Sequence, residues 1–293
     1  MKMIHLVGQQ PIPILMAARQ WRADANVLVA TRVTESVARR VERLLPNASV
    51  HMLTADEYDL PALSSEIGKL STGDEVVFDI TGGTKMMALG MYNIASRRGI
   101  PLVYVQSDRK IRVHEYVFKE KGLSSAAHVP SELFNIDEYL RAHLPGYRVE
   151  GVHQENGKLS TGGRFEKAVA EILMSAGFEI VSGVRPENVG QQIEIDMVIR
   201  IGNRVAVAEL KKALDVDPKK GIDQLNTAAS PTYLGTFTTK LLITGSRLNP
   251  SLTQMAKEMK VVPISLESYQ DGKGFSRTDE QDLVAKVRKA LGA

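Results

Sequence analysis

The chain has 293 residues, a formal net charge of +3 and an apolar content of 43%, enough to fill the cores of two domains of ordinary size. A pI near 8.9 permits a nucleic-acid partner without arguing strongly for one. The chain has no cysteine, which excludes disulfides, thiolate zinc sites and cysteine nucleophiles and suits a reducing cytoplasm. No apolar run approaches the length of a membrane span, and the first 20 residues lack the pattern of a secretion signal. We therefore expect a soluble, cytoplasmic protein with no membrane partner.

The first half alternates short β-like runs with helical segments. The runs are MIHLVG, ANVLVA, SVHML, EVVFDI and PLVYV. Such alternation predicts a parallel, doubly wound, Rossmann-like sheet. A sixth strand, RVHEYVF within 111–118, is expected to join it antiparallel after the turn at 108–110. Neither GxxxxGK(S/T) nor GxGxxG occurs, which removes most support for an ATPase, a kinase or an NAD-dependent dehydrogenase.

The segment after EVVFDI has the features of an anion-binding turn. It reads TGGTK at 81–85 and leads directly into a helix. Two glycines allow close backbone approach, and a capping threonine with free helix N–H groups suits an anionic group, although a plain tight turn has the same residues. In the strand order 3-2-1-4-5-6, the crevice opens between strands 1 and 4. The residues expected at its walls and edges are Gly8, Gln9, Gln10, Thr31, Arg32, Thr81, Gly82, Gly83, Thr84, Lys85, Ser107 and Asp108.

Glycine and proline are dense from about 119 to 163, with a short helix expected at 136–142. We therefore predict a first domain at 1–145 with a linker to about 160, and a second domain at 160–293. The second domain is expected to begin with a helix from Arg164 that stops at Gly177. A strand, a hairpin, and then alternating helices and strands follow, which predicts a mixed sheet flanked by helices.

The run IEIDMVIRIGNRVAVAELK predicts a β-hairpin with a two-residue turn at Gly202 and Asn203. That register pairs Ile201 with Arg204, Val198 with Val207, Asp196 with Glu209, and Glu194 with Lys211. The four polar residues then share one sheet face, where directly opposed like charges cost about 0.2–1 kcal/mol. Mg²⁺ or Mn²⁺ would offset this repulsion, and Lys211 could orient or deprotonate a water. A solvated charged edge, or a bulge that breaks the register, remains the alternative.

Two further residues are candidates for the same site. Glu166 lies early in the helix that opens the second domain, on a stripe bordering its apolar face, so it is a possible third acidic group at the metal. Favourable placement of an acid at a helix N-terminus explains it equally well. Gln224 could hold a water or a phosphate, although an exposed glutamine is the simpler interpretation.

From this order of elements, residues 160–293 resemble the PD-(D/E)xK restriction-endonuclease-like superfamily. The resemblance implies Asp196 and Glu209 as metal ligands and Lys211 as the lysine that helps activate the attacking water. Glu166 takes the place of the family's helical acid. Such enzymes cut phosphodiester bonds by in-line attack. Ile195, where the family motif has proline, precedes the aspartate in this chain.

The strand-terminal DITGGTK within the Rossmann-like half, residues 1 to about 120, resembles the CARF sensor domains of CRISPR-associated ancillary proteins. This implies a homodimer that binds a cyclic oligoadenylate, most simply cyclic tetra-adenylate, across its two-fold axis. The whole chain then resembles the CARF nucleases of type III CRISPR systems, in which the messenger activates metal-dependent cutting of DNA or RNA.

Three alternatives remain open. The second domain could bind DNA without cutting it, as part of a ligand-sensing regulator. The chain could instead be a restriction or repair endonuclease controlled by another nucleotide. A sensor that degrades its own ligand is the third, although the sequence at 81–85 identifies no cleaving group.

Overall fold

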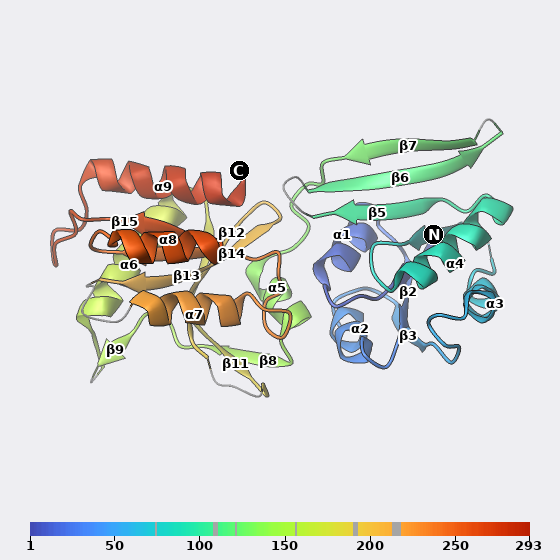
Figure 1. Ribbon diagram of the computed structural model, residues 1–293, viewed down its shortest axis with the longest axis horizontal. Helices are drawn as coiled ribbons and strands as arrows, with labels where there is room; N and C mark the ends of the chain where they lie inside the picture. The colour runs from blue at the N-terminus through green and yellow to red at the C-terminus, as the bar shows by residue number, and fades with distance from the viewer. Residues whose placement is uncertain (74, 108–110, 121, 156, 190–192, 213–217) are drawn as a thin grey trace. The chain divides into compact units, whose positions relative to one another are not determined.

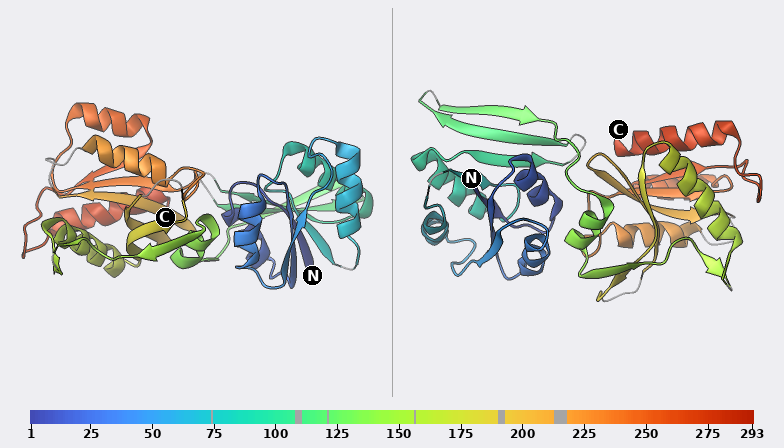
Figure 2. Two further views of the ribbon diagram at one scale, coloured as in Figure 1. Left: turned by 90° about the horizontal axis from the view of Figure 1, so that it is seen from below. Right: turned by 180° about the vertical axis from the view of Figure 1, so that it is seen from behind.

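The structure is a computed structural model that describes residues 1–73, 75–107, 111–120, 122–155, 157–189, 193–212 and 218–293. The chain divides into two compact units, residues 1–134 and 135–293, which are coloured along the chain in Figure 1 and shown from two more directions in Figure 2. Among the described residues, no helix is both long and apolar enough to cross a membrane.

The first unit is a doubly wound α/β domain. Its strands are β1 (Lys2–Leu6), β2 (Ala25–Ala30), β3 (Ala48–Met52), β4 (Val76–Asp79), β5 (Leu102–Gln106), β6 (Arg112–Lys119) and β7 (Gly122–His128). Its helices are α1 (Ile12–Gln20), α2 (Glu35–Glu42), α3 (Leu60–Leu70) and α4 (Lys85–Arg98). The sheet order is β3-β2-β1-β4-β5-β6-β7, parallel from β3 to β5 and antiparallel beyond. The predicted Rossmann-like fold and the antiparallel sixth strand are confirmed.

Helices cover both faces of this sheet, with α1 and α2 on one side and α3 and α4 on the other (Figure 1). Leu63 of α3 and Met87 of α4 pack on Ile4 and Phe78 of the central strands, all fully buried. The strand that the sequence did not predict, β7, reads GLSSAAH and has no apolar alternation. Its backbone pairs with β6 along the whole of its length, so tertiary pairing rather than local pattern creates it.

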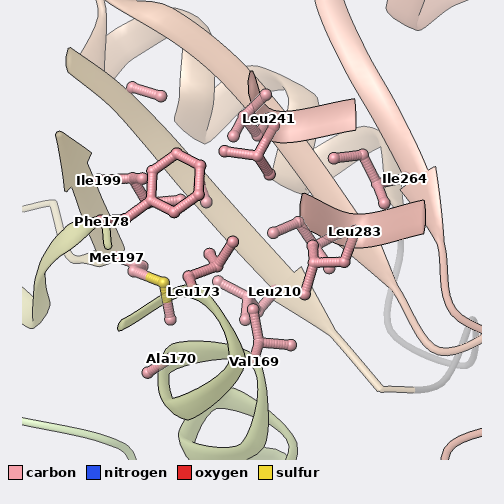
Figure 3. Close-up of a cluster of buried hydrophobic side chains, with 14 of the residues drawn as sticks. Val169, Ala170, Leu173, Phe178, Met197, Ile199, Leu210, Leu241, Ile264 and Leu283 are labelled. Atoms are coloured by element: carbon pink, nitrogen blue, oxygen red, sulfur yellow. The ribbon is translucent and has the colours of Figure 1, made fainter. Parts of the chain in front are cut away.

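The second unit is a mixed sheet between helices. Its strands are β8 (Gly146–Val149), β9 (Gln154–Glu155), β10 (Lys158–Leu159), β11 (Glu179–Glu187), β12 (Ile195–Ile201), β13 (Arg204–Lys211), β14 (Thr239–Thr244) and β15 (Val261–Ser265). Its helices are α5 (Ile136–His143), α6 (Thr161–Ser175), α7 (Pro218–Ala228), α8 (Pro250–Glu258) and α9 (Arg277–Leu291). The main sheet has the order β15-β14-β13-β12-β11-β8. Helices α6 and α9 bury one of its faces through Val169, Leu173 and Leu283 (Figure 3).

The boundary between the units falls at 134/135, earlier than the 145–160 region that the sequence predicts. Helix α5 packs with the second unit because the Tyr139 hydroxyl donates to Leu234 O at 2.7 Å. In addition, Ile136 N donates to the Glu179 carboxylate at 2.9 Å. The glycines and prolines of 145–163 therefore mark turns around β8, β9 and β10 within one unit.

The predicted hairpin register is observed from Ile201 opposite Arg204 to Met197 opposite Ala208. Gly202 takes a φ of +57°, as the first residue of this two-residue turn requires. Beyond Met197, the Asp196 carboxylate accepts a hydrogen bond from Leu210 N at 2.8 Å. The turn therefore fixes which residues of β12 and β13 meet at the far end of the hairpin.

Glu66 of α3 fixes the loop that follows β3. Its carboxylate accepts hydrogen bonds from Thr54 N at 3.0 Å, Ala55 N at 2.8 Å and the Thr54 hydroxyl at 3.0 Å, and it meets His51 Nε2 at 2.8 Å. Burial opposes the charge and is the largest single influence. The backbone and side-chain hydrogen bonds together outweigh it and lower the pKa of Glu66 to about 2.

We expect Glu66→Gln to lower the free energy of unfolding by about 1.5–3 kcal/mol at neutral pH, because charge-assisted hydrogen bonds are lost. Since the folded pKa lies below the unfolded one, this contribution is complete above about pH 4.5 and disappears as the pH falls towards 2. Urea unfolding of both proteins across this range measures it. A difference that stays constant down to pH 2 would contradict the assignment.

Candidate functional sites

The first candidate site lies where β1 and β4 end side by side, at the point where the strand order reverses. A Cβ placed on Gly82 would lie 2.2 Å from Leu6 O and 2.6 Å from Gly8 N. The backbone of the 81–83 turn therefore rests directly on the end of β1. Gly83 has a φ of +73°, which also favours glycine. The structure thus brings together the predicted Gly8 and TGGTK segments.

The turn runs into the N-terminus of α4. The Thr84 hydroxyl accepts a hydrogen bond from Met87 N at 3.2 Å and donates to Glu57 O at 3.3 Å, so Thr84 caps the helix as predicted. Lys85 is exposed in the first turn. An exposed lysine beside the positive end of a 14-residue helix is suited to an anionic ligand.

Thr81 is half-buried, and its N–H and hydroxyl are hydrogen-bonded within the protein. Its N–H and hydroxyl donate to Asp79 at 3.0 and 2.5 Å, and its hydroxyl oxygen accepts from Val105 N at 2.8 Å. The Thr81 side chain therefore orients the turn. The part of the turn that a ligand could contact is the backbone of Gly82 and Gly83.

The remaining predicted edge residues follow β1, β2 and β5. Gln9 and Arg32 are exposed, while Gln10 and Ser107 are half-buried. Thr31 is buried, and its N–H donates to the Thr34 hydroxyl at 3.1 Å, which makes it part of a local turn. The predicted residue Asp108 lies outside the described residues.

The second candidate site lies at the end of β12 and β13 that is distant from their turn. Glu209 is 2% exposed, and Lys211 Nζ lies 2.6 Å from its Oε1. Asp196 on the neighbouring strand is held by Leu210 N. Glu166 is the sixth residue of α6 and is buried; its Oε2 accepts from His153 N at 3.0 Å. A position in the second turn removes the explanation of Glu166 as a simple N-terminal acid.

Burial, together with like charge, raises the pKa values of the carboxyl groups in this cluster. Burial, followed by the Glu209 carboxylate, raises the pKa of Asp196 well above its usual range. Burial also raises the pKa of Glu209, although Lys211 partly offsets it, and burial raises the pKa of Glu166. Burial alone would lower the pKa of Lys211, but Glu209 and Asp196 outweigh it and the pKa is raised. Lys211 therefore carries a charge and is a poor base.

The predicted register placed Glu194 opposite Lys211, and the structure shows other partners. Arg185 pairs with Glu194 at 2.8 Å, while Lys211 pairs with Glu209. Nothing in the sequence pattern of β11 indicated Arg185. The charge of Glu194 still acts on Glu166 and Glu209, because it helps to raise the pKa of both.

Helix α7, which carries the candidate Gln224, also borders the cluster, but the close approach at Gly221 was not predicted from the sequence. A Cβ on Gly221 would lie 3.1 Å from Glu209 Cγ, so a glycine lets the helix approach the carboxylate. Gln224 is half-buried on this helix, three residues further along and hence on the same face. Gly221, a glycine within an otherwise helical segment, was the sequence feature that could have indicated this close approach.

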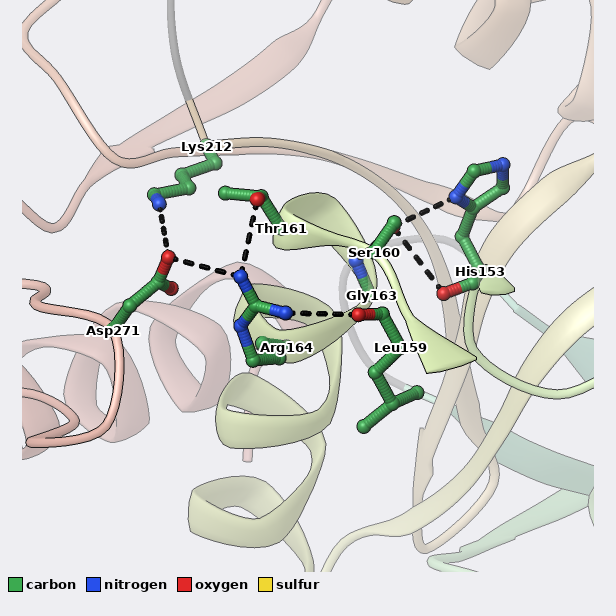
Figure 4. A network of polar contacts seen from close by, with 8 residues as sticks. All are labelled: His153, Leu159, Ser160, Thr161, Gly163, Arg164, Lys212 and Asp271. Carbon is green, nitrogen blue, oxygen red and sulfur yellow. Dashed lines mark hydrogen bonds and ion pairs between the residues drawn. The ribbon is translucent and has the colours of Figure 1, made fainter. Parts of the chain in front are cut away.

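A polar network frames the start of α6 beside Glu166 (Figure 4). Ser160 caps the helix through Gly163 N at 2.9 Å and meets His153 Nδ1 at 2.8 Å. Asp271 pairs with Arg164 at 3.2 Å and with Lys212 at 2.8 Å. This network joins α6 to the end of β13, the two elements that carry Glu166 and Lys211.

The donor set suits a hard divalent cation. Asp196 and Glu209 supply carboxylate oxygens with excess negative charge, which is what Mg²⁺ and Mn²⁺ prefer. Glu209 Oε1 is buried and accepts no aligned hydrogen bond among the described residues, despite the nearby ammonium of Lys211. The described residues contain no group of three or more histidine, aspartate and glutamate side chains already arranged to hold a metal. The two carboxylates therefore fit a metal, but a complete set of protein ligands is not assembled.

The profile of the Card1 CARF domain family matches residues 3–139, which covers the first unit except for its first two residues. The first unit is a Card1-type CARF domain. No curated protein matches the chain in sequence. Among solved structures, Can2 from Sulfobacillus thermosulfidooxidans in complex with cyclic tetra-adenylate is 14% identical, with a TM-score of 0.74 and 99% of each chain covered.

Two further structures share the fold of the CARF unit and of the second unit together. VC1899 from Vibrio cholerae is 11% identical with a TM-score of 0.74, covering 99% of this chain and 98% of that one. A type III CRISPR defence DNA nuclease activated by cyclic oligoadenylate is 17% identical with a TM-score of 0.67, covering 100% of this chain and 51% of that one. The second unit therefore shares the fold of the corresponding part of these structures.

We expect Gly82→Ala to destabilise the CARF unit by about 1–3 kcal/mol and to weaken anion binding, because the added methyl group overlaps Leu6 O. Gly90→Ala on α4 is the matched control, since its Cβ would meet nothing closer than 3.6 Å. Thermal unfolding with and without a nucleotide ligand measures both. Equal behaviour of the two variants would show that the close approach is not required.

Proposed function

We propose that the chain is a nuclease that is activated by a cyclic oligoadenylate and depends on Mg²⁺ or Mn²⁺, acting as a cytoplasmic homodimer in type III CRISPR defence. The observation that carries the proposal is the cluster of buried Glu209 with half-buried Asp196 and Lys211 in the same chain as a Card1-type CARF domain. The substrate class is DNA, RNA or both, because all share the phosphodiester that this chemistry attacks.

The residues divide the work of hydrolysis. Asp196 and Glu209 would hold the cation, with Glu166 as a third acidic group. The bound cation would supply charge stabilisation and a water of lowered pKa. Lys211, which is charged because its pKa is raised, orients the attacking water and faces the negative charge that develops on the phosphate. Gln224 on α7 would contact the same water or a substrate phosphate.

In the sensor, the proposed ligand is cyclic tetra-adenylate, which is bound in the Can2 structure of the same fold. The phosphates would lie on the backbone N–H groups of Gly82 to Lys85 and beside the Lys85 ammonium. The residues at 8–10, 31–32 and 107–108 would border the adenosine groups. A two-fold ligand of this kind suits an isologous dimer.

A regulator with a non-cleaving, DNA-binding second unit is the other candidate, because Lys211 already neutralises an oxygen that a metal would use. An assay of cleavage with and without metal distinguishes the nuclease from the non-cleaving regulator. Thermal-shift measurements with cyclic oligoadenylates and with linear nucleotides distinguish both of these from an endonuclease that is controlled by another nucleotide.

We expect Asp196→Asn, Glu209→Gln and Lys211→Ala each to reduce cleavage at least ~100-fold. Asp196→Asn should not lower the thermal midpoint, because it removes a repulsive buried charge. Glu171→Gln is the control, since this carboxylate lies on α6 with Glu166 but is 61% exposed. Labelled DNA and RNA incubated with Mn²⁺ provide the assay. Full activity in any of the three variants would sink the assignment.

We expect cyclic tetra-adenylate to raise cleavage by at least ~10-fold, because a ligand with differential affinity for the active arrangement shifts its population. Lys85→Ala should require more ligand for the same stimulation, whereas Lys69→Ala on α3 should not. Titration of each cyclic oligoadenylate against initial cleavage rate measures the effect. Activity that is unchanged over the whole titration counts decisively against the sensor function.

A further inference from the structure

A histidine is buried in the middle of the CARF sheet, below the turn that presents Gly82 and Gly83. His5 of β1 is 0% exposed. Its Nδ1 lies 2.9 Å from Asp79 Oδ2 on β4, and its Nε2 lies 3.0 Å from Asn26 Oδ1 on β2. One side chain thus connects the three adjacent strands β2, β1 and β4 through polar contacts that are closed to solvent.

The hydrogen bonds of Asn26 determine whether Nε2 of His5 carries a hydrogen. Asn26 Nδ2 donates to Pro46 O at 3.1 Å. Turning the amide over would instead place two carbonyl oxygens in contact. Asn26 therefore presents Oδ1, an acceptor, to His5, and His5 Nε2 must carry a hydrogen.

The second proton lies between His5 Nδ1 and Asp79 Oδ2. The other oxygen of Asp79 accepts both the N–H and the hydroxyl of Thr81, and hydrogen bonds of this kind stabilise the ionised carboxylate. We infer from these contacts that the ring carries this proton, so that the pair is an imidazolium and a carboxylate.

The pair is linked to the turn by a continuous chain of contacts. Asp79 holds Thr81, and the Thr81 hydroxyl oxygen accepts from Val105 N of β5. The next residue is Gly82, which rests on Leu6 O and Gly8 N. The backbone donors offered to an anion are consequently oriented by Asp79, and Asp79 is oriented and neutralised by His5.

We propose that His5 is a positioning residue for anion binding by the sensor, and that its charge shields the ligand from the carboxylate of Asp79. Without the imidazolium, a buried negative charge would lie next to the turn that receives phosphates. The charge would repel them, and the carboxylate would lose the contact that fixes it. A side chain with a single hydrogen-bond donor cannot replace His5, because one group must donate to both β2 and β4. The ligand in this proposal is the cyclic oligoadenylate of the proposed function.

The experiment compares His5→Asn, Asp79→Asn and the double variant with the wild-type chain, and His128→Asn provides an exposed histidine as control. Calorimetric titration with cyclic tetra-adenylate is expected to give at least ~10-fold weaker binding for His5→Asn. The double variant should recover most of this loss, because the uncompensated carboxylate is gone. A histidine with only a structural role would lower the melting temperature in both variants and leave the dissociation constant unchanged, which would overturn the proposal.

A second readout does not depend on the ligand. In ¹⁵N–¹H spectra at neutral pH, both ring nitrogens of His5 should carry slowly exchanging protons, and one should be lost in Asp79→Asn. A wild-type ring with a single N–H would overturn the assignment of the imidazolium. Amide exchange at Thr81 and Val105 should accelerate in His5→Asn. If the wild-type chain fails to bind cyclic tetra-adenylate, the proposed function fails, while the ring spectra and amide exchange still decide whether His5 holds the turn.

Discussion

A carboxylate buried in a β-sheet requires hydrogen-bonding or charged partners, and this requirement organises one end of each unit. In the CARF unit, Asp79 contacts His5 and accepts hydrogen bonds from Thr81. In the second unit, Asp196 and Glu209 face a single lysine. Desolvation makes an unpaired charge far more costly than a solvated one, so the partners of these carboxylates are fixed by necessity.

The two units meet this requirement to different degrees. Asp79 has a full set of partners and holds a turn in place. Asp196, Glu209 and Glu166 all keep raised pKa values despite Lys211, which means that the negative charge of the cluster is only partly offset. A second, movable cation would complete the balance. Unrelieved repulsion of this kind is characteristic of sites whose ligand binds and leaves.

Local pattern was enough to predict some features of the chain and not others. The alternation about Gly202 determined the register of β12 and β13, and the strand order placed Gly8 beside Gly82. His5 pairs with Asp79, and Arg185 pairs with Glu194, between separate segments of the chain. The periodicity of apolar residues along the sequence does not predict such pairs. The glycines and prolines near 145–163 were read as a linker because turn residues look alike within and between domains.

The position of Lys211 allows the candidate site of the second unit to change without a large motion within that unit. Its ammonium lies on Glu209, and the next residue, Lys212, is tied through Asp271 to Arg164 at the start of α6. A small displacement of α6 relative to β13 would therefore change the spacing between Glu166 and Lys211. Allosteric coupling is typically about 1–3 kcal/mol, and altering one ion pair in a buried cluster is sufficient to supply it. A ligand that favours one of two such arrangements can control a site it never touches.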